Sequence, residues 1–184
     1  MNEVEKLIRE LCPKGVELKG LGEICDYEQP TKYIVNSTIY SEEYVTPVLT
    51  AGKSFILGKT NETEGIYLAN NKEPVIIFDD FTTSFHWVNF NFKVKSSAMK
   101  ILHTNRKKAD PKYLFEVIKT IEFRHDDHKR YWISEFSKIK IPLPSLVIQK
   151  QLIAETEKEE EIINSNKKLI EIMEQKIEKV ISEI

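Results

Sequence analysis

Two short segments contain the residue types that metal-dependent nucleases use. Asp79 and Asp80 directly follow the apolar run PVIIF, and His125 and His128 belong to the segment HDDH. Adjacent residues of a strand point to opposite faces, and no acid-x-Lys element follows on a neighbouring strand. The histidine pair lacks a second pair of ligands at a workable spacing. We therefore expect structural or surface roles for the two aspartates and no bound metal.

No other part of the sequence supplies a catalytic motif. The chain contains neither a G-x-G-x-x-G turn after a strand nor a phosphate-binding P-loop. No serine or cysteine stands in the sequence context of a nucleophile elbow. The Asn/Asp-Pro-Pro-aromatic loop with which amino-methyltransferases hold a flipped base is also missing, because DPKY at 110–113 lacks the second proline. We therefore expect a protein without catalytic activity and without a cofactor.

Four polar segments suit nucleic-acid binding, because they interleave cations with hydroxyl, amide and aromatic groups. They are FTTSFHW (81–87), KVKSSAMK (93–100), HTNRKK (103–108) and HDDHKRYW (125–132). Lysine and arginine contact phosphates, whereas Thr, Ser, Asn, His and Arg can hydrogen-bond to base edges. The alternative is a solvated surface rich in lysine. The residues that we expect to contact DNA are Thr82, Thr83, Ser84, His86, Lys93, Lys95, Ser96, Ser97, Lys100, Arg106, His125, His128, Lys129, Arg130 and Tyr131.

The distribution of charge supports this assignment better than the total charge does. The net charge of the whole chain is −2, and its pI is about 6.1. Residues 93–140, however, carry 13 basic and 6 acidic groups, whereas residues 1–92 carry 8 basic and 14 acidic groups. A cationic segment of this kind favours contact with an anionic partner such as nucleic acid.

The elements that must position these segments are mainly short strands. Residues 3–11 are predicted to form a helix with one apolar stripe, and CPKG ends it. From residue 16 to residue 102, short apolar runs separated by Gly, Asn and Thr predict strands. The alternating segment HWVNFNFKVK (86–95) predicts one strand with an apolar face on the core and a polar face, including Lys93 and Lys95, in solvent.

Further along, a helix is predicted at 111–122, with Asp110 as its N-cap and Pro111 at its first position. The polar and aromatic stretch EFRHDDHKRYW is interpreted as a loop, and KIKIPL as a last short strand.

The chain then changes character, because residues 145–184 contain neither Gly nor Pro. A continuous helix over this stretch would be about 60 Å long, too long to bury its apolar stripe on its own domain. Its heptad pattern predicts pairing with another long helix, and an ordinary helix packed on the domain is the alternative. The expected interface residues are Ile163, Asn166, Ile170, Met173, Ile177, Val180 and Ile184.

Cysteine content and hydropathy indicate a compartment. The two cysteines, Cys12 and Cys25, suit a reducing environment better than a disulfide framework. No stretch approaches the length of uncharged apolar residues that a membrane span needs, and the first residues show no apolar signal region. We therefore expect a cytoplasmic protein without a membrane association.

Several segments resemble the specificity subunits of type I restriction-modification systems. LCPKGVELKGLGEIC resembles the start of a target recognition domain, and PVLTAGKSFILGKTNETEGIY and PVIIFDDFTTSFHWVNFNFKVKSSAMKIL resemble its body. HKRYWISEFSKIKIPLPSLVIQKQLIAE resembles the junction between that domain and the conserved helix. The sequence departs from the usual junction at Ser145 and Val147, where a proline and an acidic residue are common.

The resemblance implies an α+β target recognition domain at 1–144, followed by a long dimerisation and spacer helix at 145–184. It also implies a non-catalytic role: the protein would select the DNA sequence, separate modification subunits would methylate adenine, and a restriction subunit would translocate and cleave. Family members usually carry two recognition domains and two helices, whereas this chain has one of each. It is therefore either a half-length protein or half of a longer one.

Two other functions remain as alternatives to DNA recognition. The acidic and histidine pairs leave open a stand-alone metal-dependent nuclease, and the terminal helix leaves open a coiled-coil protein without DNA contact. If the chain is a specificity subunit with one helix, we expect a homodimer through that helix, because two-fold pairing rebuilds the arrangement of the two-helix proteins.

Overall fold

The computed structural model describes residues 3–51, 54–123 and 130–182. The chain begins with α1 (Glu3–Leu11), β1 (Leu18–Gly20), α2 (Leu21–Ile24), β2 (Cys25–Glu28) and the 3-10 helix η1 (Pro30–Tyr33). The strands β3 (Thr46–Leu49), β4 (Ile56–Thr60), β5 (Val75–Asp79), β6 (Phe85–Val88), β7 (Lys93–Val94) and β8 (Met99–Thr104) follow. The last elements are α3 (Pro111–Lys119), η2 (Phe136–Lys138), β9 (Lys140–Pro142) and α4 (Leu146–Ser182).

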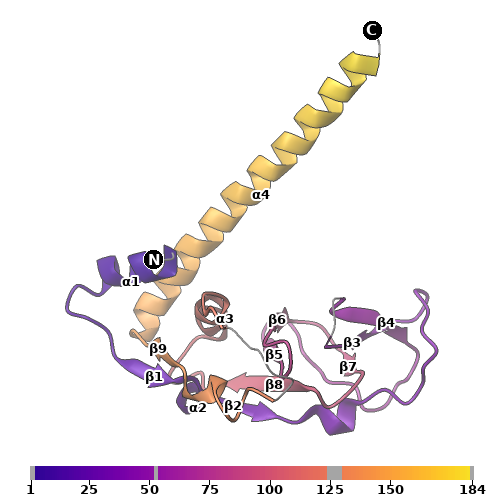
Figure 1. The fold of residues 1–184 in the computed structure, drawn as a ribbon, viewed down its shortest axis with the longest axis horizontal. Coiled ribbons are helices and arrows are strands. Elements are labelled where there is room, and N and C mark those ends of the chain that lie inside the picture. Colours follow the sequence, from indigo (N-terminus) through magenta and orange to yellow (C-terminus); the bar gives the residue numbers. More distant parts are fainter. Residues whose placement is uncertain (1–2, 52–53, 124–129, 183–184) are drawn as a thin grey trace.

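Three small sheets build the globular part. The central sheet has the order β2-β8-β5-β6 and is antiparallel throughout. A second sheet, β4-β3-β7, lies beside it at the end remote from α4, and β1 pairs with β9 near the base of that helix (Figure 1). The combination of antiparallel sheets, α3 and the long α4 confirms the predicted α+β fold with a C-terminal helix.

Strand β5 is one of the two inner strands of the central sheet, and the chain covers both of its faces. Ile76 and Phe78 point into a core formed with the helices, whereas Val75 and Ile77 point into a core formed with the second sheet. All five residues of β5 are buried, which explains its unbroken apolar run. The loops that leave this strand are therefore held by a rigid framework.

The predicted helix at 111–122 forms α3, although it ends at Lys119. Asp110 caps it as expected, and its carboxylate accepts a hydrogen bond from the Lys112 N–H at 2.8 Å. Pro111 occupies the first helical position, where the missing N–H has no cost.

The prediction of one strand over 86–95 is wrong. Strand β6 ends at Val88, and β7 belongs to the second sheet, where it pairs in parallel with β3. The chain crosses between the two sheets in the intervening residues. Lys93 is buried and not in solvent, because Glu62 pairs with its ammonium at 3.0 Å and the Glu64 carbonyl accepts from it at 2.6 Å.

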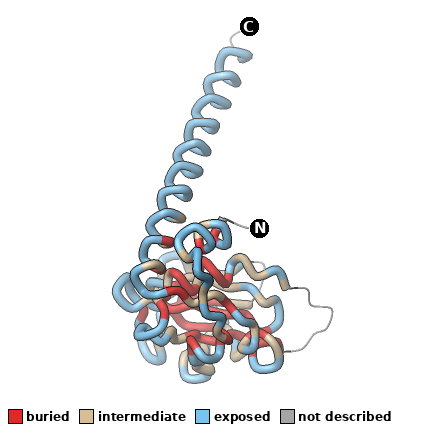
Figure 2. The backbone as a smooth tube through the Cα atoms, turned by 90° about the vertical axis from the view of Figure 1, so that its left-hand side faces the viewer, coloured by how far each residue is buried: buried red, intermediate tan, exposed pale blue. Residues whose placement is uncertain are grey.

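Helix α4 has 37 residues and is about 55 Å long. Near its start, Gln149 and Leu152 are buried against the domain, and Glu160 still pairs with Lys119 of α3 at 3.2 Å, but the later described turns project away from the domain (Figures 1 and 2). The alternative of an ordinary helix packed along its own domain is therefore wrong. None of the helices within the described ranges is long and apolar enough to cross a membrane.

Candidate nucleic-acid interface

The turn after β5 presents three of the predicted contact residues. The Asp79 carboxylate accepts hydrogen bonds from the Phe81 N–H and the Thr82 hydroxyl, and the Thr82 and Ser84 hydroxyls lie 2.9 Å apart. Thr83 has a φ of 59°, in the left-handed region that a β-branched residue rarely adopts. Asp79 thus holds a tight turn with the hydroxyls of Thr82 and Ser84 exposed at its tip.

The neighbouring residue, Asp80, is buried and bonds to two other segments. Its N–H donates to the Ala98 carbonyl at 3.1 Å, and its carboxylate pairs with the Lys100 ammonium, also at 3.1 Å. The same carboxylate accepts the Trp132 N–H at 2.8 Å, and its backbone carbonyl accepts the Tyr131 N–H at 3.1 Å. Asp80 therefore joins the turn after β5 to the start of β8 and to the segment that begins at Arg130.

Gln29 completes this arrangement from the end of β2. Its side-chain amide donates to the Ser97 carbonyl at 2.6 Å, and its amide oxygen accepts from the Lys100 ammonium at 2.6 Å. The ammonium also lies 5.4 Å from the centre of the Tyr27 ring, a cation–π distance. We call Asp80, Lys100, Gln29 and the bonded backbone of Ala98, Tyr131 and Trp132 the Asp80 junction.

The Asp80 junction brings three of the predicted segments to one end of the central sheet. Their surface side chains provide hydroxyls from two turns and one guanidinium, a set of groups that can donate to base edges and phosphates. The members of this candidate interface are Thr82, Thr83, Ser84, Ser96, Ser97 and Arg130.

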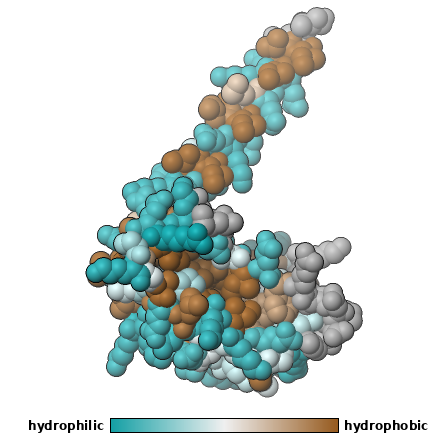
Figure 3. All heavy atoms as spheres, turned by 60° about the vertical axis from the view of Figure 1, so that its left-hand side comes forward, coloured by the Kyte–Doolittle hydropathy of each residue, from teal (hydrophilic) through white to brown (hydrophobic). Residues whose placement is uncertain are grey.

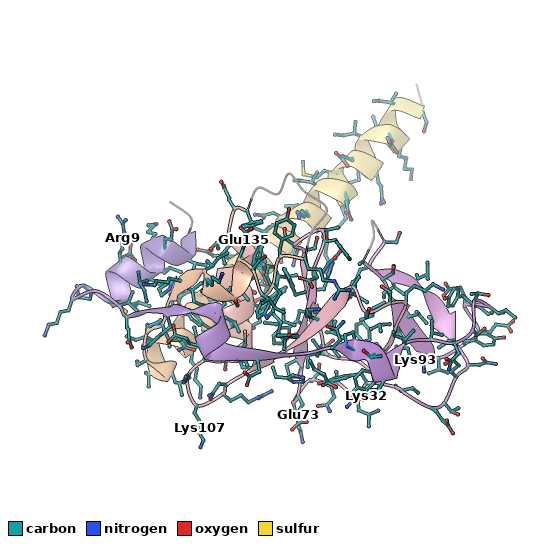
Figure 4. All side chains as sticks on the ribbon, turned by 60° about the horizontal axis from the view of Figure 1, so that its bottom comes forward. Arg9, Lys32, Glu73, Lys93, Lys107 and Glu135 are labelled. Carbon is teal, nitrogen blue, oxygen red and sulfur yellow. The ribbon has the colours of Figure 1, made fainter. Side chains whose placement is uncertain are left out.

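Other predicted contacts lie elsewhere. Because β5 and β8 are antiparallel, Asp79 pairs with Met99 and Ile76 pairs with Leu102, and the residues after Thr104 emerge at the opposite end of the sheet. Arg106 is at that end, where its guanidinium donates to the Lys72 carbonyl at 3.1 Å. In Figure 4, Glu73 and Lys107 extend from one side of the molecule, and Glu135 lies on the opposite side.

His86 lies on the edge strand β6, next to the candidate interface. Its ring stacks on Phe55 with 3.8 Å between the centroids and 10° between the planes. Burial lowers the pKa of His86, and the nearby Asp79 carboxylate opposes that effect. The imidazole is therefore mainly neutral at pH 7 and offers a hydrogen bond, not a positive charge.

The structure corrects three of the expected DNA contacts. Lys93 and Lys100 are each 2% exposed as side chains, the first paired with Glu62 at 3.0 Å and the second with Asp80. Tyr131 is also buried. These side chains cannot reach a base or a phosphate in this conformation, so we remove them from the candidate interface. Lys95 is half-buried, and its ammonium lies 3.2 Å from the Tyr40 hydroxyl.

Some of the predictions fall on residues that the structure does not describe. These are the contacts proposed at His125, His128 and Lys129, and the last helix position, Ile184.

The doublet Asp79-Asp80 has structural roles, as expected, although no local pattern indicated which partners it would bind. Gln29 was missed altogether. Its partner Lys100 is 71 residues away, and no local pattern distinguishes such a glutamine from one on the surface.

The helix residues predicted at an interface stand in solvent in the single chain. Their heptad positions continue those of Gln149 and Leu152, which pack on the domain. One stripe of α4 is therefore buried near the start of the helix and exposed along the rest of it. Apolar groups recur along the exposed part of α4 in Figure 3. We call this stripe the seam; its described members are Ile163, Asn166, Ile170, Met173, Ile177 and Val180.

Taken together, the fold and the clustered loops define an α+β domain with a polar loop surface and a long helix whose seam residues are exposed in the described part of the chain. Among the described residues, no group of three or more His, Cys, Asp or Glu side chains could hold a metal ion.

Comparison with known proteins shows which proteins of known kind this chain resembles. No family model matches the sequence. Over 163 residues the chain is 51% identical to the Type I restriction enzyme EcoR124I/EcoR124II specificity subunit of Escherichia coli, covering 83% of this chain and 40% of that protein. Over most of its length the chain is thus a homologue of a type I specificity subunit.

Two solved structures share the fold. The HsdS subunit from Thermoanaerobacter tengcongensis has a TM-score of 0.56 and 14% identity, covering 90% of this chain and 44% of that one. The S subunit of a type I restriction-modification system from M. genitalium has a TM-score of 0.62 and 14% identity, covering 85% of this chain and 42% of that one. The chain spans less than half the length of each of these relatives.

Proposed function

We propose that this chain selects the DNA sequence on which a type I restriction-modification system acts. In this role it directs separate adenine methyltransferase and restriction subunits to their target and performs no catalysis. The observation that carries the proposal is the convergence of three donor-rich segments at one end of the central sheet, in a chain related to specificity subunits. Residues 1–144 would form the target recognition domain, and residues 145–184 the dimerisation and spacer helix.

The nuclease alternative is weakened by the bonds that the two aspartates make. Asp79 caps its own turn, and Asp80 is paired with Lys100, so neither carboxylate is directed at a solvent-exposed metal site. The alternative of a coiled-coil protein without DNA contact leaves the clustered polar loops without a role. A protein that reads DNA in a restriction system works in the cytoplasm, where the free thiols of Cys12 and Cys25 are stable.

The seam supports a homodimer. Ile163, Ile170 and Ile177 are 52–56% exposed and recur at heptad spacing, as they do in helices that pair along their length. Two copies that pair antiparallel about a two-fold axis would place identical recognition domains at opposite ends of the paired helices. The DNA target would then be an inverted repeat with a fixed spacer. Asn166, a polar residue within the seam, would help to select the register.

The test uses the full chain assembled with the modification subunits of the same system. A library of duplexes with a randomised region is incubated with the complex, and the bound fraction is sequenced. We expect enrichment of one two-part inverted repeat, and no enrichment by modification subunits alone. If the complete assembly binds the library without any sequence preference, the proposal is wrong.

A further inference from the structure

The burial of the ion pair between Asp80 and Lys100 costs desolvation free energy for both charges. Both side chains are 2% exposed, so that each charge has lost almost all of its contact with water. Buried ion pairs of this type often contribute no more stability than apolar residues of the same size, and their retention therefore calls for another explanation. In several proteins such groups specify a unique arrangement of the chain.

The geometry of the Asp80 junction indicates which arrangement this is. The Asp80 carboxylate bonds to Lys100 at the start of β8 and to the Trp132 N–H in the segment that begins at Arg130. Lys100 in turn bonds to Gln29, which holds the Ser97 carbonyl. Each of the three segments of the candidate interface is thus attached to the same pair of buried charges.

The adjacent Asp79 carboxylate behaves differently. Its hydrogen bonds go to Phe81 and Thr82, within its own turn. Asp79 shapes one segment, whereas Asp80 sets the position of that segment relative to the other two.

We propose that Asp80, through Lys100 and Gln29, is a positioning residue for DNA discrimination. The inference rests on the proposed function. Base readout requires several donors to meet base edges at hydrogen-bond distance together, and a relative shift of about 1 Å between segments breaks that match. Contacts with phosphates by flexible cations tolerate such a shift, because they depend on charge more than on direction. Loosening the junction therefore lowers discrimination more than it lowers general DNA affinity.

Three variants test the junction. Asp80→Asn keeps an oxygen for the Trp132 N–H but loses the charge that pairs with Lys100. Gln29→Met leaves the buried ion pair intact and removes the bonds to Ser97 and Lys100. The double variant Asp80→Asn/Lys100→Met removes both charges, so that no unpaired buried charge remains to unfold the domain.

The control is Glu62→Gln. Glu62 pairs with the other buried lysine, Lys93, at 3.0 Å in a part of the fold outside the Asp80 junction. This variant also breaks a buried lysine pair, at the first residue of the 93–100 segment, but it leaves every bond of the Asp80 junction in place.

Each variant is assembled with the modification subunits and titrated with the duplex that the wild type selects from the random library and with a scrambled duplex. We expect the ratio of the two affinities to fall about tenfold or more in Asp80→Asn and in the double variant, and less in Gln29→Met. The slope of log affinity against log salt should stay constant. Glu62→Gln should lower the unfolding temperature without changing the ratio.

A second readout follows the segments directly. Hydrogen exchange of Asp80→Asn should be faster than wild type at Trp132 and in residues 96–98, and unchanged around Glu62. If the folded junction variants discriminate as well as the wild type does, the positioning role is wrong while the proposed function stands. If the wild-type assembly selects no sequence, the proposed function fails first, and the inference fails with it.

Discussion

The side-chain oxygen of Gln149 accepts a hydrogen bond from the Asp110 N–H at 2.8 Å and so connects the start of α3 with the base of α4. The side-chain nitrogen of Gln149 donates to the Pro144 carbonyl at 2.8 Å and to the Lys108 carbonyl at 3.1 Å. One buried amide therefore satisfies three backbone groups and fixes the point from which the long helix leaves the domain.

Gln149→Leu should destabilise the chain, because three backbone groups would lose their partner in a buried site. Each such loss costs about 1–3 kcal/mol, and partial access of water reduces the total, so we expect about 2–4 kcal/mol. Urea unfolding measures the change. Gln151→Leu, an exposed position two residues further along α4, is the control and should change stability by less than about 0.5 kcal/mol. Equal effects at the two positions would contradict this role of Gln149.

Ile170→Asp and Ile177→Asp test the seam. Either variant would bury an unpaired carboxylate between paired helices, which is costly, and we expect association to weaken at least about tenfold. Sedimentation velocity over a range of concentrations measures the change. Ile172→Asp alters an exposed isoleucine outside the seam and should leave the dimer intact. Dimers that persist in both seam variants would show that copies associate elsewhere.

Arg130→Ala and Arg106→Ala compare the two ends of the central sheet. Arg130 belongs to the candidate interface, and loss of a base contact there should cost about 1–3 kcal/mol on the preferred duplex and relax discrimination at one position. Loss of a phosphate contact would instead weaken binding to all duplexes and lower the salt slope by about one. Arg106 lies at the other end and should not affect discrimination. If only Arg106→Ala changes discrimination, the DNA surface has been assigned to the wrong end.

His86→Phe should reduce the dependence of stability on pH. Because burial lowers the pKa of His86 in the folded chain, the unfolded chain takes up a proton first as the pH falls below about 6.5. Wild-type stability should therefore fall as pH decreases through this range. The phenyl ring of the variant can still stack on Phe55 but does not titrate. Between pH 7.5 and pH 5.5, the free energy of unfolding, measured by chemical unfolding, should fall less for the variant than for the wild type. An identical fall in both proteins would contradict the lowered pKa of His86.

Cys25 should react with thiol reagents only when the domain opens. Burial raises the pKa of its thiol to about 12, and the charge of Asp26 adds to the increase, so the reactive thiolate is scarce at pH 8. In a Cys12→Ser background, we expect slow labelling by a maleimide in buffer and fast labelling in denaturant. Native labelling at the rate of a free thiol would show that this part of the core is open.

Local signals in the sequence determined several elements of the protein. Asp110 and Pro111 predicted the start of α3 because a cap and a proline act on the next turn of backbone. The long run without Gly or Pro predicted α4, and its heptads located the seam. The junction around IPLP carried the family resemblance that the relatives support.

Tertiary structure alone decided which polar residues share a surface. Asp80 and Trp132 are 52 positions apart, and Gln29 and Lys100 are 71 apart, so no periodicity within a window could join them. The same reason explains the errors at Lys93 and Lys100. Alternation tells which residues share a face of a strand, but whether that face meets solvent depends on what the rest of the chain places over it. In this protein Glu62 covers Lys93 and Asp80 covers Lys100, so both lysines of the cationic segment are buried in ion pairs.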